Sequence, residues 1–216
     1  MTKMREPVKG TTEAGRRREQ RAQATRERIV SAARAEFLEL GYAATTIEVI
    51  AAKAGVATAT VYQAFGAKSA ILARALDEAI VGDEEPAAML ERDWVMAARK
   101  NPDPRKRLAI VVQHAAGAAA RTAPLKTVMR DAAATELDIR ELIDADDARR
   151  LATQRTLVEV VLGRRPAETA VATFFLLVNS AAYTLAVEHL GWSAQQWKRW
   201  LVKVLDRGLL GDDAAP

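Results

Sequence analysis

The stretch from Thr58 to Lys68 brings hydroxyl, amide and amine side chains close together in the sequence. Small hydroxyl and amide groups can hydrogen-bond the base edges in the major groove of DNA, and a tyrosine hydroxyl or a lysine amine can bind a phosphate. On a helix, one face of this stretch presents such groups with no large charged side chain among them. That outward face consists of Thr58, Ala59, Thr60, Tyr62 and Gln63. The pattern indicates a helix that reads DNA.

Three short amphipathic helices are predicted within residues 25–72, and together they hold this face outward. The first begins at Thr25, which can cap free N–H groups, and ends at Gly41, because glycine is common just past a helix end. The second is capped by Thr46, ends at Gly55 and is about two turns long. The expected inward residues are Ile29, Ala32, Ala33, Phe37 and Leu40, then Ile47, Ile50, Ala51 and Ala54, then Val61, Ala64 and Phe65. Helices in this order are typical of a helix-turn-helix.

The same residues resemble the DNA-binding domain of the tetracycline-repressor (TetR) family. The matching elements occur in family order over about 48 residues, and they are TRERI, GYAATTIEVIA, AGV, TVYQAF and the lysine at position 68. The resemblance implies DNA-backbone contacts by Thr46 and Lys68, a phosphate contact by Tyr62, and a core position for Phe65. It places Thr58, Ala59, Thr60 and Gln63 on the recognition helix.

Two positions depart from the family pattern. Ala57 stands where a capping serine is common, and Gly66-Ala67 replaces a usual Pro-Ser pair. A lost cap costs about 1 kcal/mol, and Thr58 can take over the role. The departures concern the starts of the third and fourth helices. The alternative interpretation is three core helices of an ordinary helical domain.

Positive charge is concentrated in the first third of the chain. Residues 1–75 hold 13 Lys and Arg against 7 Asp and Glu, an excess of +6, whereas residues 76–216 hold 19 against 21, an excess of −2. Basic side chains near the recognition helix can displace counterions from DNA phosphates. The distribution therefore favours nucleic-acid binding by the N-terminal part.

Residues 1–24 are expected to be a disordered basic tail, since almost no apolar side chain is available to offset the entropy of ordering. Arg16 to Arg18 can reach a minor groove, as basic arms do, or they can simply be solvated. No apolar run follows the early charges, so a secretory signal is not expected. The chain contains no cysteine, which excludes disulfides and thiolate chemistry.

The predicted fold class is all-α, with about nine or ten helices. Alanine, leucine, arginine and glutamate dominate, and alternating β-branched patterns are absent. The expected domains are residues 25–72, which bind DNA, and residues 73–216, which bind an effector and dimerise. Further helices are expected over 68–81, from Pro86, over 104–121, from Pro124, and over 138–163.

Residues 170–187 contain no charged side chain and are predicted to form one buried helix. A membrane span is the alternative, but the run is short, rich in alanine and flanked by Glu168 and Glu188. Ser193 and Gln196 form a capping box for the last helix, and Trp192 and Trp197 are placed as a hydrophobic staple. From the TetR resemblance, the predicted homodimer interface comprises Phe175, Trp197, Trp200, Leu201, Val204 and Leu205; a stripe within one subunit's core is the alternative.

A small-molecule cavity is expected in the C-terminal half, because such sites combine apolar walls with a few hydrogen-bonding groups. The candidate lining residues are Trp94, Gln113, His114, Met129, Phe174, Asn179 and Tyr183. Each of these residue types is more often an ordinary core residue.

Enzyme activity is not expected. The two histidines are far apart in the sequence, and no catalytic motif or phosphate-binding glycine loop is present. The acidic runs at 83–85 and 144–147 lack the spacing of a calcium loop, so no metal or cofactor is expected.

The sequence thus predicts a cytoplasmic, ligand-responsive transcriptional regulator. We expect a homodimer that binds an inverted-repeat DNA operator and is released by a small molecule of unknown identity. Repression rather than activation is implied by the TetR resemblance. The alternative is a helical small-molecule-binding or enzymatic protein with a vestigial helix-turn-helix.

Overall fold

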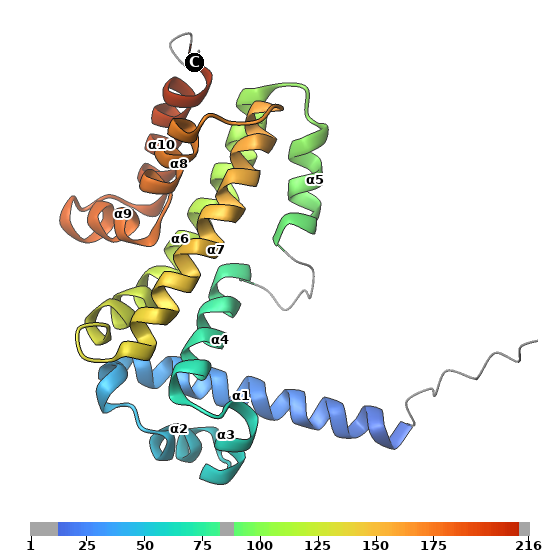
Figure 1. The fold of residues 1–216 in the computed structure, drawn as a ribbon, viewed down its shortest axis with the longest axis vertical. Coiled ribbons are helices and arrows are strands. Elements are labelled where there is room, and N and C mark those ends of the chain that lie inside the picture. Colours follow the sequence, from blue (N-terminus) through green and yellow to red (C-terminus); the bar gives the residue numbers. More distant parts are fainter. Residues whose placement is uncertain (1–12, 83–88, 212–216) are drawn as a thin grey trace, which may run out of the picture.

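The computed structural model describes residues 13–82 and 89–211, which form ten α-helices and contain no β-strand (Figure 1). The helices are α1 (Glu13–Ala44), α2 (Ile47–Ala54), α3 (Thr58–Phe65), α4 (Lys68–Val81), α5 (Asp93–Lys100), α6 (Pro104–Ala132), α7 (Leu137–Leu162), α8 (Glu168–Leu177), α9 (Ser180–Thr184) and α10 (Ala194–Leu210). A 3₁₀ turn, η1 (Met89–Glu91), precedes α5, and a π-helical turn, η2 (Leu185–His189), follows α9. The all-α prediction is confirmed.

The kink in α1 and both ends of α2 and α3 lie where local signals predict helix boundaries. Gly41 interrupts α1 with φ 78°, and Gly55 ends α2 in the left-handed conformation. The Thr46 hydroxyl accepts a hydrogen bond from the Val49 N–H at 3.3 Å. Ile29 and Phe37 are fully buried in the core shared by these helices. Because helices as short as α2 and α3 are unstable alone, this burial is what stabilises them.

The start of the first helix differs from the prediction. Thr25 lies inside α1, which begins at Glu13, and its hydroxyl donates to the Arg21 carbonyl at 2.9 Å. From 13 to 28 the helix projects from the body with almost no buried residue (Figure 1). Extending an existing helix costs far less than nucleating one, so a polar segment can remain helical beyond the packed part. Residues 1–12 of the predicted tail lie outside the described residues.

Two long helices, α6 and α7, form the centre of the C-terminal half, and α5, α8 and α10 pack around them (Figure 1). Pro104 occupies the first turn of α6, as predicted. The helix expected to begin near Pro124 is not separate, because α6 continues through this proline to Ala132. Ala123 and Leu125 are buried on either side of it, and this packing outweighs the lost backbone hydrogen bond. Pro86 lies outside the described residues.

The single helix expected over 170–187 is broken. The Asn179 side chain caps α9 by accepting from the Ala182 N–H at 2.8 Å, and the chain then turns into η2. In the described part of the chain, no single helix has the length and apolarity to cross a membrane, although α8 together with Ser180–His189 passes that test as a pair bent by 44°. The predicted Ser193–Gln196 capping box is present at the start of α10. Trp192 packs edge-on against Trp200 of the same helix, and its staple contact with Trp197 stays a prediction.

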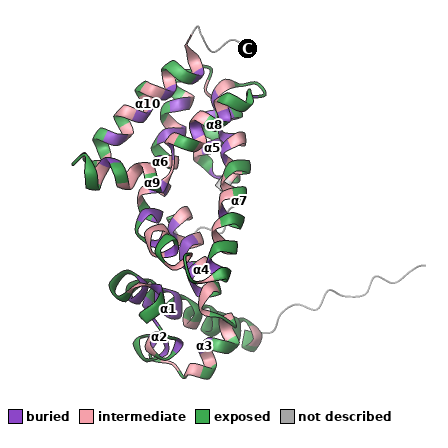
Figure 2. Cartoon of the chain, turned by 60° about the vertical axis from the view of Figure 1, so that its left-hand side comes forward, coloured by how far each residue is buried: buried purple, intermediate pink, exposed green. Residues whose placement is uncertain are grey.

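Two hydrophobic clusters divide the molecule, one at each end (Figure 2). The first joins α1 to α4 with Leu125 and Met129 of α6 and Ile139 of α7. The second joins α5 to α10 around α6 and α7. Both long helices therefore contribute to the packing of the N-terminal domain and to that of the C-terminal half.

Candidate DNA-binding surface and ligand cavity

The polar face of α3 points to solvent. Val61 is fully buried and anchors the opposite face, whereas Tyr62 is 51% exposed. Ala57 makes no side-chain cap, and Thr58 does not replace it; instead the Thr60 N–H donates to the Ala57 carbonyl at 2.9 Å. The predicted DNA-binding residues all reach the surface, with Thr46, Ala59, Tyr62 and Gln63 exposed and Thr58, Thr60 and Lys68 partly exposed. Their contact with DNA stays a prediction.

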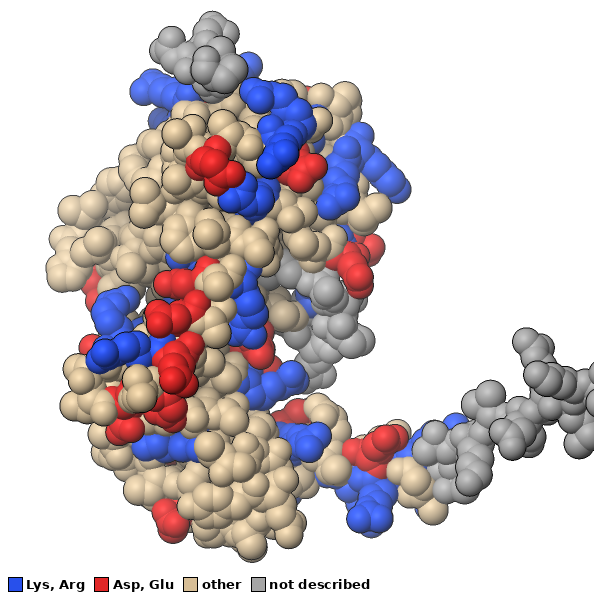
Figure 3. Space-filling model, in the orientation of Figure 1, with Lys and Arg blue, Asp and Glu red and all other residues tan. Residues whose placement is uncertain are grey.

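Helix α3 carries no charged side chain. In Figure 3 the lower end of the molecule, formed by α2 and α3, carries few charged side chains. Arg16, Arg17, Arg18 and Arg21 are exposed on the projecting part of α1, where Arg17 forms an ion pair with Glu13 at 2.6 Å. A helix face that is neutral and flanked by cations suits close approach to a base edge next to phosphates.

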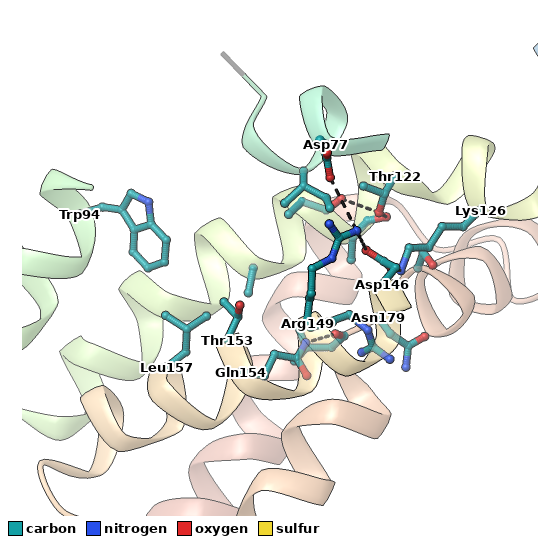
Figure 4. Close-up of a pocket in the computed structure, with 17 residues that line it drawn as sticks. Asp77, Trp94, Thr122, Lys126, Asp146, Arg149, Thr153, Gln154, Leu157 and Asn179 are labelled. Carbon is teal, nitrogen blue, oxygen red and sulfur yellow. Dashed lines mark hydrogen bonds and ion pairs between the residues drawn. The ribbon is translucent and has the colours of Figure 1, made fainter. Parts of the chain in front are cut away.

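A cavity of about 240 Å³ lies between α4, α5, α6, α7 and the break that follows α8 (Figure 4). Figure 4 shows Trp94 at one end, the charged residues Asp77, Lys126, Asp146 and Arg149 at the other, and Thr153, Gln154 and Leu157 between them. The remaining lining residues are Ile80, Ala115, Ala118, Ala119, Thr122, Arg150, Val178, Asn179 and Ser180. One end of the cavity is thus apolar and the other ionic.

An adjoining hollow of about 290 Å³ shares the charged end of this cavity. Lys126, Asp146 and Arg150 line both spaces, and Arg130 and Asp147 are added in the hollow. The charged side chains at this end therefore face both spaces.

The buried ionic groups hold one another in place. Asp146 is 4% exposed, and its carboxylate forms an ion pair with Lys126 Nζ at 2.7 Å. Burial lowers the pKa of the Arg150 guanidinium, and Asp147 opposes this effect. The Arg150 guanidinium also lies 3.6 Å from the centroid of the Phe175 ring. Burial raises the pKa of the Asp77 carboxyl, against the opposing effect of Arg149 at 3.8 Å.

Gln154 has one satisfied and one unsatisfied polar atom. Its Nε2 donates to the Val178 carbonyl at 2.8 Å, which fixes the orientation of the amide. Its Oε1 is buried and accepts no hydrogen bond within the described residues. Buried acceptors are normally paired, so a donor is missing at this point of the wall.

A family model described as bacterial regulatory proteins of the tetR family matches residues 29–75. This range covers α2, α3 and the packed parts of α1 and α4. The N-terminal domain of the chain belongs to the tetR family. The TetR resemblance seen in the sequence is confirmed.

Solved structures of transcriptional regulators share the whole fold. FadR from Bacillus subtilis in complex with stearoyl-CoA has a TM-score of 0.63 at 19% identity, and the match covers 86% of this chain and 98% of FadR. A transcriptional regulator from Saccharomonospora viridis in complex with choline has a TM-score of 0.62 at 17% identity, covering 87% and 98%. A regulator from Rhodococcus has a TM-score of 0.61 at 21% identity, covering 88% and 99%. Comparison with curated protein sequences gives no match. The chain therefore has the fold of these transcriptional regulators, two of which were solved with a bound ligand.

The structure brings only some of the predicted ligand residues to the cavity. Trp94 and Asn179 line it, and Met129 lines the adjoining hollow. Phe174 is fully buried in the core and lines neither space, so its contact with a ligand stays a prediction. Tyr183 packs edge-on against Trp197, and neither it nor Gln113 or His114 lines the cavity; His114 instead stacks on Trp94 with ring centroids 4.4 Å apart.

The charged lining residues were missed in the sequence. Their signal is visible on α7, where Asp146, Arg150 and Gln154 stand four residues apart in positions that the helical period directs inward. Polar residues that interrupt an apolar stripe must find partners in the interior. Such an interruption marks the wall of a site more directly than scattered aromatic residues do.

Half of the predicted dimer interface belongs to the subunit's own core. Trp197, Leu201 and Leu205 are at most 1% exposed in the single chain, so a partner cannot contact them in this conformation and that part of the prediction is wrong. These three side chains lie on the buried side of α10, which packs against α6 and α8. Phe175, Trp200 and Val204 are partly exposed and stay predicted interface residues.

Proposed function

We propose that the chain is a ligand-responsive transcriptional repressor that binds an inverted-repeat operator as a homodimer. The observation that carries the proposal is the outward face of α3, where Thr58, Thr60 and Gln63 surround an exposed Tyr62 in a tetR-family domain. Hydroxyl and amide groups on a short helix are suited to the major groove. Such a repressor acts without enzymatic chemistry and works in the cytoplasm, where its operator is.

Dimerisation supplies the affinity that one α3 lacks. A two-turn helix contacts few bases, whereas a two-fold dimer reads two half-sites about one helical turn apart, or a multiple of that. Exposed leucines occur at 176 on α8, at 185 on η2 and at 190 directly after η2, and Phe175 beside the first of them is partly exposed. Exposed apolar side chains grouped on consecutive elements favour an isologous contact there.

The cavity supports release by a small molecule. Asp77 and Ile80 of α4 line it, and the same helix begins at Lys68, next to α3. A ligand that prefers one position of α4 shifts the spacing of the two recognition helices, whereas equal affinity for both positions changes nothing. The ligand complexes of FadR and of the Saccharomonospora viridis regulator support the use of this fold for effector binding.

Selection of operators from a random DNA pool tests the proposal. The full chain is incubated with the pool, and the retained DNA is sequenced. We expect an inverted repeat whose affinity falls steeply with salt, because phosphate contacts release counterions. Binding that is feeble, insensitive to salt and without sequence preference would instead support a helical ligand-binding protein with a vestigial helix-turn-helix.

A further inference from the structure

We propose that the effector is an amphipathic anion with three recognisable parts. An anionic head lies beside Arg150, an N–H or O–H donor faces Gln154, and an apolar body lies between Trp94 and Leu157. The inference rests on the proposed function, because it names the chemical class of effector that the same cavity takes.

The preference for an anion follows from the charges inside the cavity. The side chains of Asp146, Lys126 and Arg150 are 6%, 17% and 20% exposed, so this inner group carries one more positive than negative charge. Lys126 neutralises Asp146 at 2.7 Å. The carboxylate partner of Arg150 is Asp147, which is 3.3 Å away and 49% exposed. Arg150 also donates to the Phe175 carbonyl at 3.1 Å and lies over the Phe175 ring, but both of these partners are neutral. The half-exposed Asp147 is thus the carboxylate that offsets the charge of Arg150, and the lowered pKa of this guanidinium agrees with its burial.

The remaining charged pair lies at the rim and does not reverse that balance. Asp77 and Arg149 are 46% and 58% exposed, and their atoms approach to 3.8 Å. Water screens both groups, so neither attracts a ligand as strongly as a buried charge does. In the adjoining hollow, the exposed Arg130 and the half-exposed Asp147 carry opposite charges, so they leave the balance unchanged. An anion is thus favoured at the head end and an ammonium group is disfavoured.

Gln154 identifies the second part of the effector. Its side chain is buried, its Nε2 is committed to the Val178 carbonyl, and its Oε1 lacks a donor within the described residues. A ligand N–H or O–H beside this oxygen removes the cost of leaving the acceptor unpaired. An effector without such a donor should bind more weakly.

The order of these groups along α7 sets the order of groups in the effector. Gln154 lies about 6 Å along the helix axis from Arg150, and Leu157 lies about 10 Å from it, at 1.5 Å per residue. An apolar cavity of roughly 150 Å³ holds benzene, so a cavity of 240 Å³ holds one aromatic ring and a short linker. The head, the donor and the ring therefore occur in that order.

Four related compounds test this assignment by calorimetry on the full-length protein. N-benzoylglycine carries the anion, the N–H and the ring. N-benzoylglycinamide lacks the charge, N-(2-aminoethyl)benzamide replaces it with a cation, and N-benzoylsarcosine replaces the N–H with N–CH₃. We expect the glycine compound to bind at least about tenfold more tightly than the cation, and about fivefold more tightly than the sarcosine compound. Equal affinities, tighter binding of the cation, or no binding of any compound overturns the proposal.

A variant locates the anion. Arg150→Gln should remove most of the difference between N-benzoylglycine and its amide, and Arg150→Lys should keep part of it. Arg164→Gln, which removes an exposed charge from the loop before α8, should keep all of it. A folded Arg150→Gln protein that retains the full anion preference overturns the assignment; if this variant does not fold, the four compounds on the unaltered protein decide it.

Operator binding is measured on the same preparation. Salt-dependent, sequence-selective DNA binding without any anion preference would contradict the proposed class of effector but not the repressor function. Anion preference without sequence-selective DNA binding would contradict the proposed repressor function but not the class of ligand.

Discussion

Lys68 holds the end of α1 against the start of α4 through Tyr42. Its Nζ donates to the Tyr42 carbonyl at 2.7 Å and lies 4.0 Å from the centroid of the Tyr42 ring. Burial, with the nearby Asp138 carboxylate of α7, raises the pKa of the Tyr42 hydroxyl. This position was predicted only as a DNA contact, and the structure gives it a second task at the junction between the DNA-binding domain and the long helices.

Replacing Lys68 is therefore expected to affect both stability and DNA binding. Lys68→Met keeps the length of the side chain but removes the donor and the charge, so the free energy of unfolding should fall by about 1 kcal/mol. DNA affinity should fall as well. Denaturant unfolding and operator titration measure the two effects, and an unchanged unfolding midpoint would contradict the structural task of this lysine.

Tyr62 should behave differently, because its side chain is 51% exposed. Tyr62→Phe removes one hydroxyl and should weaken each half-site by about fivefold without altering stability. Tyr62→Ala should weaken it further. The comparison with Lys68→Met separates a surface contact from a junction residue. Wild-type affinity of Tyr62→Phe would remove the hydroxyl from the proposed phosphate contact.

The N-terminal domain was predictable because its signals are local. Gly41 and Gly55 adopt positive φ where the helices end, and Thr46 caps α2 as its position indicates. The start of α1 is not predictable from an apolar pattern, because the residues before Thr25 bury almost nothing. Helix-forming arginine, glutamate, glutamine and alanine can prolong a packed helix without burial.

The C-terminal half was less predictable because its decisive features depend on packing between distant segments. The break after α8 has a local signal, since Asn179 and Ser180 form a helix start inside an otherwise uncharged run. The sequence signal for the cavity is weaker and consists of the polar residues that interrupt the apolar stripe of α7. No sequence pattern distinguishes Trp197, which is buried in its own subunit, from Trp200, which is partly exposed.

Asp77 should give the protein a dependence on pH. Burial raises the pKa of its carboxyl, so the folded state holds the proton more tightly than the unfolded state and stability declines as pH rises through this window. Asp77→Asn is neutral throughout and should raise the thermal midpoint at about pH 7, with the difference shrinking toward about pH 4. Asp131→Asn, on an exposed part of α6, is the control. A difference that grows toward acid pH would contradict the sign.

Leu176 tests the position of the proposed dimer contact. It is 67% exposed on α8, beside the predicted interface residue Phe175. Leu176→Glu should shift the dimer toward monomer, because two carboxylates would meet across a two-fold axis, and operator affinity should fall with it. Leu137→Glu is the matched control, since that side chain is 68% exposed at the start of α7. Sedimentation equilibrium reads the outcome, and equal dissociation by both variants would argue against an interface at α8.

Lys126 should be more costly to remove than any exposed lysine, because its loss leaves the Asp146 carboxylate buried. The two charged groups are 2.7 Å apart, and Asp146 forms a second, longer ion pair with Arg149 at 3.7 Å. Lys126→Met should destabilise by about 3 kcal/mol, at the low end for breaking a buried pair because Arg149 remains. The double variant Lys126→Met with Asp146→Leu removes both charges and should recover most of that loss, since a buried ion pair contributes little beyond an apolar pair of similar volume. A double-mutant cycle by denaturant unfolding measures the coupling; additive losses would show that the two side chains are not held together.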